Sequence, residues 1–177
     1  MKTAVVIIAI AFLTLNSIGF AAASDQLSEQ ETLNLYKTGR AHFDNKDYEK
    51  AYRPLVQAAQ NGDRAAGFLI GVMQMYGLGV EQNHSLAATS FMISAMQGFG
   101  DAQYMTAFFM EEETVTPVDR VELMKWYLLA VTNPTTGKPL RRRAQQSLLD
   151  LYPSECGPCA SDFRKALELV HAWRPTE

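Results

Sequence analysis

The chain has 177 residues, of which 47% are hydrophobic and 20% are charged, with 16 Lys and Arg against 19 Asp and Glu. This composition is that of an ordinary folded protein, and it excludes a disordered chain, a collagen-like chain and a polybasic nucleic-acid-binding protein. The net charge of −3 is too small to attract the chain to nucleic acid or to anionic lipid, so neither is expected as a partner. Two cysteines are too few for a disulfide framework that carries the fold.

The first segment, residues 1–23, has the pattern of a secretory signal peptide. A short basic start precedes a nearly uninterrupted apolar run over residues 4–20, and three alanines follow that run. The pattern predicts cleavage between Ala23 and Ser24, a mature chain that is periplasmic or secreted, and no stable membrane span after cleavage. An uncleaved membrane anchor stays open as the alternative, because about twenty apolar residues can cross a bilayer.

Residues 24–177 carry repeated helix signals and no strand signals. Ser28 and Glu31 have the spacing of a capping box, which predicts a helix that begins just after Ser28. Caps, glycine stops and apolar periodicity indicate further helices. The expected helical segments are 28–43, 48–61, 63–77, about 83–97, 101–113, 116–132, 140–151 and 161–173. The loops between them are short, so neighbouring helices are expected to pack antiparallel.

Three local features of these segments lead to specific expectations. Asp63 and Asp101 are expected to cap the helices that follow them, and the pair Thr116–Pro117 is expected to open another helix. Pro54 stands inside an expected helix, where it removes a hydrogen bond and costs about 3 kcal/mol unless the helix bends or starts later.

The helices recur with a period in the mid-thirties. Ala66 and Ala102 open similar helices and lie 36 residues apart. An alanine recurs late in the second helix of each pair, at nearly the same spacing: Ala58, Ala95 and Ala130. The residues four positions before these alanines recur with the same spacing, and they are Pro54, Phe91 and Trp126. Helix–turn–helix units of this period typically stack into a solenoid, because one such pair cannot bury its apolar face alone.

Residues 66–73 and 76–80 read AGFLIGVM and YGLGV, which resemble the opening helix and the turn of the Sel-1-like repeat (SLR), a relative of the tetratricopeptide repeat (TPR). Residues 48–63 and 123–130 resemble its closing half. The resemblance implies an all-α, right-handed α-solenoid of about three to four stacked helix pairs over residues 24–177, with 140–177 as a degenerate repeat and C-terminal cap. The residues expected to shape the repeats are Ala66, Gly71, Gly77, Gly79, Ala95, Ala102, Trp126 and Ala130.

The sequence departs from the SLR pattern at two loops. Residues 113–118 replace the glycine-containing turn of the preceding repeat, so this loop is expected to have another shape. Residues 133–139 form a longer junction than usual, which is expected to turn the last helix pair away from the stack.

The resemblance implies a non-enzymatic scaffold that binds a protein or peptide on the concave face, which the first helices of the pairs line. The candidate contact residues are exposed positions expected on those helices, namely Lys37, Arg40, Gln103, Tyr104 and Phe108. No cofactor is expected. The partner and the oligomeric state stay open.

Cys156 and Cys159 enclose a Gly-Pro dipeptide, the frame found in thioredoxin-like oxidoreductases. In that fold the motif follows a buried strand, whereas residues 147–153 here do not read as a strand. A disulfide clip between the two cysteines, before the last helix, is therefore the favoured interpretation in an oxidising compartment. An envelope thiol–disulfide redox protein is the alternative.

No other motif carries chemistry. His42, His84 and His171 are far apart in the sequence and are interpreted as surface or packing residues, so no metal site is expected. Binding of a cell-wall fragment or a β-lactam, known for some secreted cysteine-rich SLR proteins, is a further alternative. That resemblance is partial, because those proteins have a cysteine pair in each repeat.

Overall fold

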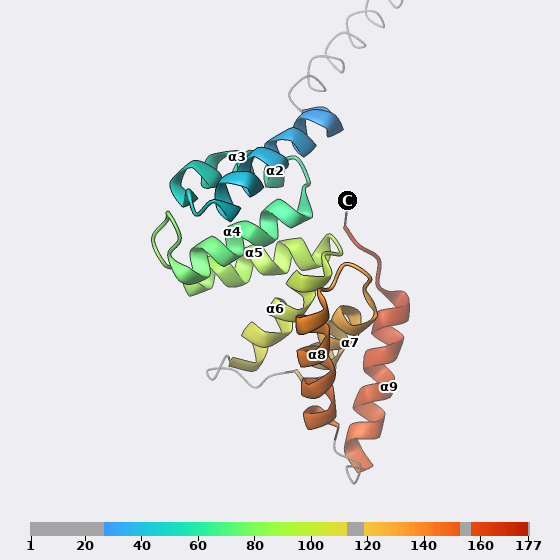
Figure 1. Cartoon of the computed structure of the whole chain (residues 1–177). Coiled ribbons are helices and arrows are strands. Elements are labelled where there is room, and N and C mark those ends of the chain that lie inside the picture. Colours follow the sequence, from blue (N-terminus) through green and yellow to red (C-terminus); the bar gives the residue numbers. More distant parts are fainter. Residues whose placement is uncertain (1–26, 113–118, 153–156, 177) are drawn as a thin grey trace, which may run out of the picture.

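The computed structural model describes residues 27–112, 119–152 and 157–176, and these ranges form eight helices and no strand (Figure 1). The helices are α2 (Glu29–Asp44), α3 (Tyr48–Gln60), α4 (Arg64–Tyr76), α5 (His84–Met96), α6 (Gly100–Glu112), α7 (Arg120–Thr132), α8 (Lys138–Leu151) and α9 (Gly157–Ala172). The predicted all-α class is confirmed for this part of the chain. The predicted signal peptide, with Ala23 and Ser24 at its cleavage site, lies outside the described residues and stays a prediction.

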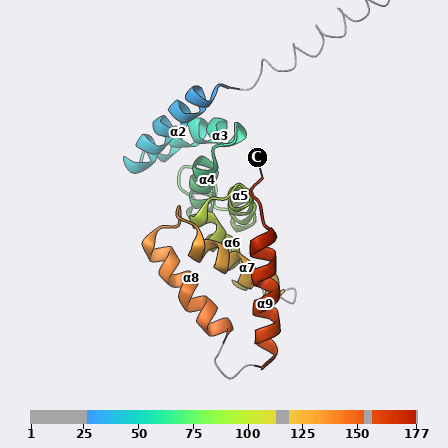
Figure 2. The same ribbon diagram turned by 90° about the vertical axis from the view of Figure 1, so that its right-hand side faces the viewer.

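The helices stack as consecutive pairs. The helices α2 and α3, α4 and α5, and α6 and α7 pack on each other, and the second helix of each pair also packs on the first helix of the next. First helices meet as well, because α2 contacts α4 and α6 contacts α8. In Figure 2 the first helices α2 and α8 lie toward the left of the stack, and α5, α7 and α9 lie toward the right. The predicted solenoid of helix pairs is therefore confirmed.

Side-chain caps explain where several helices begin. Ser28 forms the predicted capping box: its Oγ accepts the N–H of Glu31 at 3.3 Å, and its own N–H donates to Glu31 Oε2 at 2.9 Å. The hydrogen bonds from Ser28 hold the pKa of Glu31 below its ordinary value. Asp63 Oδ1 accepts the N–H of Ala66 at 2.8 Å, and Asn83 Oδ1 accepts the N–H of Leu86 at 2.9 Å.

Other predicted helix starts were wrong by a few residues. The helix α6 begins at Gly100, so Asp101 does not cap it; its Oδ1 instead accepts the N–H of Gly137 at 2.6 Å, just before α8. The helix α7 begins at Arg120 with Asp119 as its cap, and residues 116 and 117 lie outside the described ranges. The helices α8 and α9 begin at Lys138 and Gly157, earlier than predicted, because caps and periodicity fix a helix start only approximately.

The large buried residue of the second helices recurs every 36 residues, and in two of the three repeats it lies one position after the predicted residue. Leu55, Phe91 and Tyr127 are spaced 36 residues apart, and each is fully buried. They replace the predicted series of Pro54, Phe91 and Trp126. Although Trp126 is also buried, Pro54 is only half-buried within α3, which continues through it. The three alanines Ala58, Ala95 and Ala130 are fully buried, since close helix approach leaves room only for small side chains.

Glycines allow close approach at two points of the second repeat. A Cβ atom on Gly71 would lie 2.7 Å from the ring of Phe91, so only glycine lets α4 and α5 come this close. Gly77 and Gly79 have φ values of 66° and 67°, in the left-handed region, and end α4 in a sharp turn. A Cβ atom on Gly79 would lie 2.6 Å from the backbone nitrogen of Glu49, so this turn packs against the start of α3.

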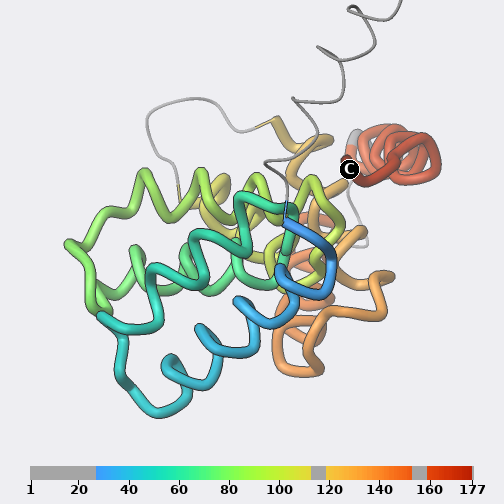
Figure 3. Tube along the Cα trace, turned by 90° about the horizontal axis from the view of Figure 1, so that it is seen from above, coloured from blue at the N-terminus to red at the C-terminus, as the bar shows by residue number. Residues whose placement is uncertain are grey.

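The last helix departs from the pairwise pattern. The helix α9 packs on α7, and Figure 3 shows it nearly end-on while α2 to α5 run across the view. Val170 and Trp173 pack against the core of the third pair, which includes Tyr127. The segment after α9 then crosses the α5–α6 turn, where the N–H of Thr176 donates to the carbonyl of Met96 at 2.8 Å.

Candidate functional site

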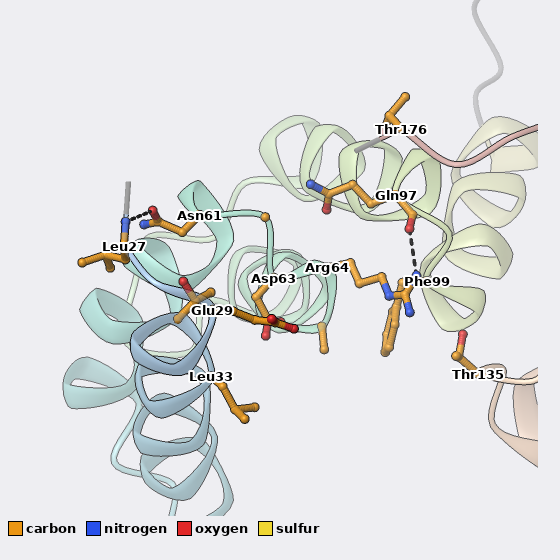
Figure 4. Close-up of a pocket in the computed structure, with 13 residues that line it drawn as sticks. Leu27, Glu29, Leu33, Asn61, Asp63, Arg64, Gln97, Phe99, Thr135 and Thr176 are labelled. Carbon is orange, nitrogen blue, oxygen red and sulfur yellow. Dashed lines mark hydrogen bonds between the residues drawn. The ribbon is translucent and has the colours of Figure 1, made fainter. Parts of the chain in front are cut away.

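A hollow of about 680 Å³ lies where the starts of the first helices come together. We call it the concave hollow after its shape, and Figure 4 draws the residues that line it. Its lining comes from the start of α2, the start of α4, the α5–α6 turn, the segment before α8 and the C-terminal segment. The lining residues are Leu27, Glu29, Thr32, Leu33, Asn61, Gly62, Asp63, Arg64, Ala65, Gln97, Phe99, Thr135 and Thr176.

The apolar part of the concave hollow is open to solvent. Leu27 and Leu33 are 39% and 38% exposed, although leucine is usually buried. Phe99 forms the opposite wall and is half-buried, with its ring 5.3 Å from that of Phe68. Apolar side chains on both walls give a ligand an apolar surface to cover.

The charged residues in the lining of the concave hollow are Glu29, Asp63 and Arg64. The Asp63 side chain already caps α4, so it is committed to the fold. Arg64 extends from α4 toward the α5–α6 turn, where its Nη1 donates to the carbonyl of Gln97 at 3.1 Å (Figure 4). A guanidinium has five N–H donors, so this single bond holds the group in place and leaves donors for a ligand.

Long-range hydrogen bonds hold the hollow's frame. The N–H of Leu27 donates to Asn61 Oδ1 at 3.1 Å, which fixes the start of α2 beside the α3–α4 turn. Ser94 Oγ donates to the carbonyl of Arg64 at 2.7 Å and joins α5 to α4. The N–H of Gly100 donates to Thr135 Oγ1 at 2.8 Å and joins α6 to the segment before α8. The site is therefore held by contacts that do not depend on a ligand.

The structure separates the predicted contact residues into two groups. Lys37 and Arg40 are exposed on α2, outside the lining of the concave hollow. Arg40 pairs with Asp44 through Nε at 2.8 Å, and this hydrogen bond raises the pKa of its guanidinium. Gln103 and Tyr104 were expected to be exposed, and that expectation is wrong, because they are 0% and 7% exposed.

Gln103, Tyr104 and Phe108 have packing roles instead. Gln103 Nε2 lies 3.5 Å from the carbonyl of Ala95, and its Oε1 accepts from Asn133 Nδ2 at 3.0 Å, so the side chain joins successive repeats. Phe108 is half-buried, and its ring stacks against that of Tyr104 with centroids 6.3 Å apart. Helix α6 is packed on several sides, so its sequence positions alone do not indicate which residues face solvent.

Sequence reasoning did not single out four of the lining residues, namely Leu27, Leu33, Arg64 and Phe99. One signal was available at Phe99, which lies 36 residues after Asp63 and therefore occupies the helix-cap position of its repeat. A large aromatic residue cannot cap a helix, so its presence there indicates another role. The cap hydroxyl comes instead from Thr135, which belongs to the next repeat.

Cys159 is 4% exposed at the start of α9. Arg120 Nη2 donates to its Sγ at 3.4 Å and to the carbonyl of Leu151 at 2.7 Å, so one guanidinium joins the starts of α7 and α9 to the end of α8. Cys156 lies outside the described residues, and the disulfide between the two cysteines stays a prediction.

His42, His84 and His171 lie on three different helices, α2, α5 and α9. In the part of the chain that the structure describes, no group of three or more His, Cys, Asp or Glu side chains is placed to hold a metal ion. The helices of that same part include none that is long and apolar enough to cross a membrane.

No protein-family model and no curated protein matches this sequence. Among solved structures, the chain is similar to the crystal structure of a protective antigen present in uropathogenic Escherichia coli strains, described as displaying an SLR fold. The TM-score is 0.61 and the sequences are 22% identical over 80% of this chain and 29% of the antigen, so this chain spans less than a third of the antigen's length. Together with the stacked helix pairs, this similarity identifies the fold as the SLR fold, an α-solenoid of about four TPR-like repeats.

Proposed function

We propose that this protein is an exported, non-enzymatic scaffold that binds a segment of a protein partner in the concave hollow. The observation that carries the proposal is a hollow of about 680 Å³ whose lining contains two exposed leucines, Leu27 and Leu33, together with Phe99 and Arg64. This volume is within the range of sites that enclose small molecules, about 300–1,000 Å³, so the hollow can hold one or a few side chains of a partner segment. Apolar side chains of the segment cover the leucines, and a carboxylate or carbonyl of the segment accepts from Arg64.

The fold supports this proposal in two ways. Stacked repeats form extended concave surfaces, and solenoid proteins commonly use these surfaces for binding. The frame of the hollow is held by hydrogen bonds that involve Asn61, Ser94 and Thr135, so little entropy is lost in ordering it when a partner binds.

The experiment that tests the proposal is selection of peptides of about twelve residues from a random display library against the mature chain. The selected peptides are then titrated against Leu33→Asp and, as a matched control, Arg53→Asp on α3, where residue 53 is also exposed. We expect Leu33→Asp to weaken binding about tenfold or more, because it places an unpaired charge on the apolar wall. Equal affinity of the two variants would contradict the proposal, provided that circular dichroism shows both to be folded.

Export is part of the proposal and has its own test. Residues 1–23 have the order of basic, apolar and small residues that signal peptidases recognise. The intact mass of the protein purified from expressing cells is expected to match a chain that begins at Ser24. A mass that corresponds to the full-length chain in the membrane fraction would instead support the uncleaved anchor.

We propose a structural role for Cys156 and Cys159 rather than redox catalysis. Thiol–disulfide exchange requires an attacking thiolate to reach a sulfur atom, and the side chain of Cys159 is only 4% exposed. An insulin-reduction assay is expected to show no turnover for this protein. Turnover that disappears in Cys156→Ser would establish the oxidoreductase alternative.

A further inference from the structure

Helix α5 has apolar residues on faces that do not meet the core. Leu86, Ile93 and Met96 form a stripe along its outer side and are 52%, 55% and 42% exposed. A helix with apolar residues all round is normally covered on all sides, so this stripe is unusual in a surface helix. From Leu86 to Met96 the stripe is about 15 Å long, at the helical rise of 1.5 Å per residue.

A second hollow lies directly beside this stripe. Helix α6 turns away from α5 after their shared turn (Figure 1), and the space between them, about 560 Å³, is lined by both helices. We call it the α5–α6 wedge. Its apolar wall consists of Ala88 and Met92 on α5 and of Phe109 and Met110 on α6. On the surface of α5, Met92 lies one turn before Met96, so the wedge meets the exposed stripe at Met96, while the exposed Ser85 and Thr89 lie between the wedge and Leu86.

The α5–α6 wedge also contains an unsatisfied hydroxyl group. Thr106 is one of its lining residues and is 2% exposed, and its Oγ1 has no hydrogen-bond partner among the described residues. A buried hydroxyl without a hydrogen-bond partner destabilises a protein, so a polar group of a ligand in the wedge would remove this cost.

The charge at the open end of the wedge is negative. Glu112 lines it where α6 ends and α5 begins, so the negative dipole end of α6 and the positive dipole end of α5 offset each other and Glu112 supplies the net charge. His84 at the start of α5 lines the same end, and the described lining residues include no lysine or arginine. The neighbouring Glu111 accepts the hydroxyl hydrogen of Tyr127 at 2.5 Å, and burial together with this bond raises the pKa of Tyr127 well above its ordinary value. One carboxylate oxygen of the exposed Glu111 is therefore engaged by Tyr127, and Glu112 is the carboxylate in the lining of the wedge.

We infer that the stripe and the α5–α6 wedge together form a docking surface for an amphipathic helix of a protein partner that carries lysine or arginine beside its apolar face. The length of the surface favours a helix over a small molecule, because three turns of helix match about 15 Å. Met92, Met96 and Met110 give the surface flexible side chains that adapt to different apolar partners. Glu112 pairs with the basic residue, and Thr106 Oγ1 bonds to a polar group at the inserted end. This surface is separate from the concave hollow, so either site can exist without the other.

The test uses a fluorescent helical peptide of about fourteen leucine and lysine residues, with leucines at i, i+3, i+4 and i+7. Its affinity is measured by fluorescence anisotropy for the mature chain and for two matched variants. Ala88→Arg fills the wedge with a large charged side chain, and Ala65→Arg does the same in the concave hollow, where Ala65 is a half-buried lining residue. We expect Ala88→Arg to weaken binding at least tenfold and Ala65→Arg to leave it within about twofold. The reverse result would place the peptide in the concave hollow and overturn this inference.

Two smaller changes test the roles of the polar groups. Glu112→Gln is expected to weaken the lysine peptide about fivefold, and this loss is expected to shrink at high salt. Thr106→Val, which keeps the shape of the side chain, is expected to raise the melting temperature of the free protein and to lower the peptide affinity about fivefold. A higher melting temperature with unchanged affinity would show that the Thr106 hydroxyl does not contact the helix.

Control measurements test whether something other than an amphipathic helix occupies the surface. A peptide of the same composition with scrambled order forms no apolar face, so its equal binding would overturn the inference. Sedimentation velocity of the protein alone is expected to show a monomer over the concentrations used. A dimer that Ala88→Arg dissociates would identify a second copy of this chain as the occupant and would also overturn the inference.

Discussion

The first two helix pairs and the last two are built from the same repeat but packed differently. From α2 to α5 each helix packs mainly on its neighbours in sequence, whereas α9 passes back over α7, so α7 lies among α6, α8 and α9. Because three helices surround α7, its buried residues occupy every side of the helix. These are Leu123, Met124, Trp126, Tyr127, Leu128, Leu129 and Ala130.

The two halves also differ in how their helix starts are satisfied. Asp63, the residue directly before α4, caps that helix. At the start of α6 the hydroxyl comes from Thr135 and the nearby Asp101 binds the N–H of Gly137, both contacts across about 35 residues of sequence. The starts of α6 and α8 therefore depend on contacts between distant segments, although α7 has a local cap at Asp119.

The largest expected effect concerns the residue that joins the two halves. Phe91 is fully buried, and its ring lies 5.5 Å from that of Phe68 and 5.8 Å from that of Phe109. Phe91→Ala is expected to lower the free energy of unfolding by about 3–5 kcal/mol, because it leaves a cavity between the halves. Urea unfolding measures the loss, and Ile93→Ala on the same helix, 55% exposed, is the control with an expected change of less than about 1 kcal/mol. Equal losses for the two variants would show that Phe91 does not join the halves.

A smaller effect is expected at the end of the second half. Trp173 is half-buried against the core of the third pair and lies over Gly98. Trp173→Ala is expected to cost about 2–3 kcal/mol, less than at a fully buried site. Hydrogen exchange should accelerate in α7 and α9 and stay unchanged in α2 and α3, with exposed His171→Ala as the control. Faster exchange in all these helices would mean that the two halves open as one unit.

The predicted disulfide offers a third comparison, again confined to the second half. If Cys156 and Cys159 are paired, reduction of the mature chain adds two hydrogens to its mass and lowers its stability by about 2 kcal/mol, the loop entropy of a short closed ring. Intact mass spectrometry and urea unfolding, each with and without reductant, measure the two effects. A Cys156→Ser, Cys159→Ser double variant is the control, because reductant should change neither its mass nor its stability. No mass change in the unaltered protein would contradict the pairing.

The smallest expected effect concerns the first half. Ser28→Ala removes the capping box of α2 and is expected to cost about 1 kcal/mol. The pKa of Glu31, which Ser28 lowers, should rise toward its ordinary value in a carboxyl NMR titration. Because the folded pKa is lowered, the Glu31 contribution is present at neutral pH and is lost as the pH falls through that pKa, so the difference between the two proteins should shrink in acid. Ser85→Ala, at an exposed position without a capping role, should leave both quantities unchanged.

Much of the fold was predictable because its signals are local. The Ser28–Glu31 box, the stop at Gly77 and the cap at Asp63 each involve residues within one turn of helix, so adjacent residues determine the outcome. The 36-residue spacing of Ala66 and Ala102 predicted the stacking, because equivalent positions must repeat when identical units pack.

The candidate sites were less predictable because they depend on which side of each helix is covered. Tyr104 has the sequence position of an exposed residue on a first helix, yet the rings of Phe108 and Tyr127 cover it. Leu33 is 38% exposed, whereas its neighbour Thr32 is one of the two buried residues of α2; the other, Gly39, lies against Leu55 of α3. A rotation of a helix by one residue exchanges its buried and exposed positions. When several faces of the helix are apolar, helical periodicity alone does not define this rotation.

The sequence by itself determined the helices, the caps at Ser28 and Asp63 and the repeat that makes the helices stack, since these depend on hydrogen bonds and apolar spacing over short distances. Only the tertiary structure decided the one-residue register of Leu55, Phe91 and Tyr127, the return of α9 onto α7, and the convergence of Leu33, Arg64 and Phe99 around one hollow. The physical reason is that side-chain packing between distant segments selects among several arrangements that satisfy the same local pattern.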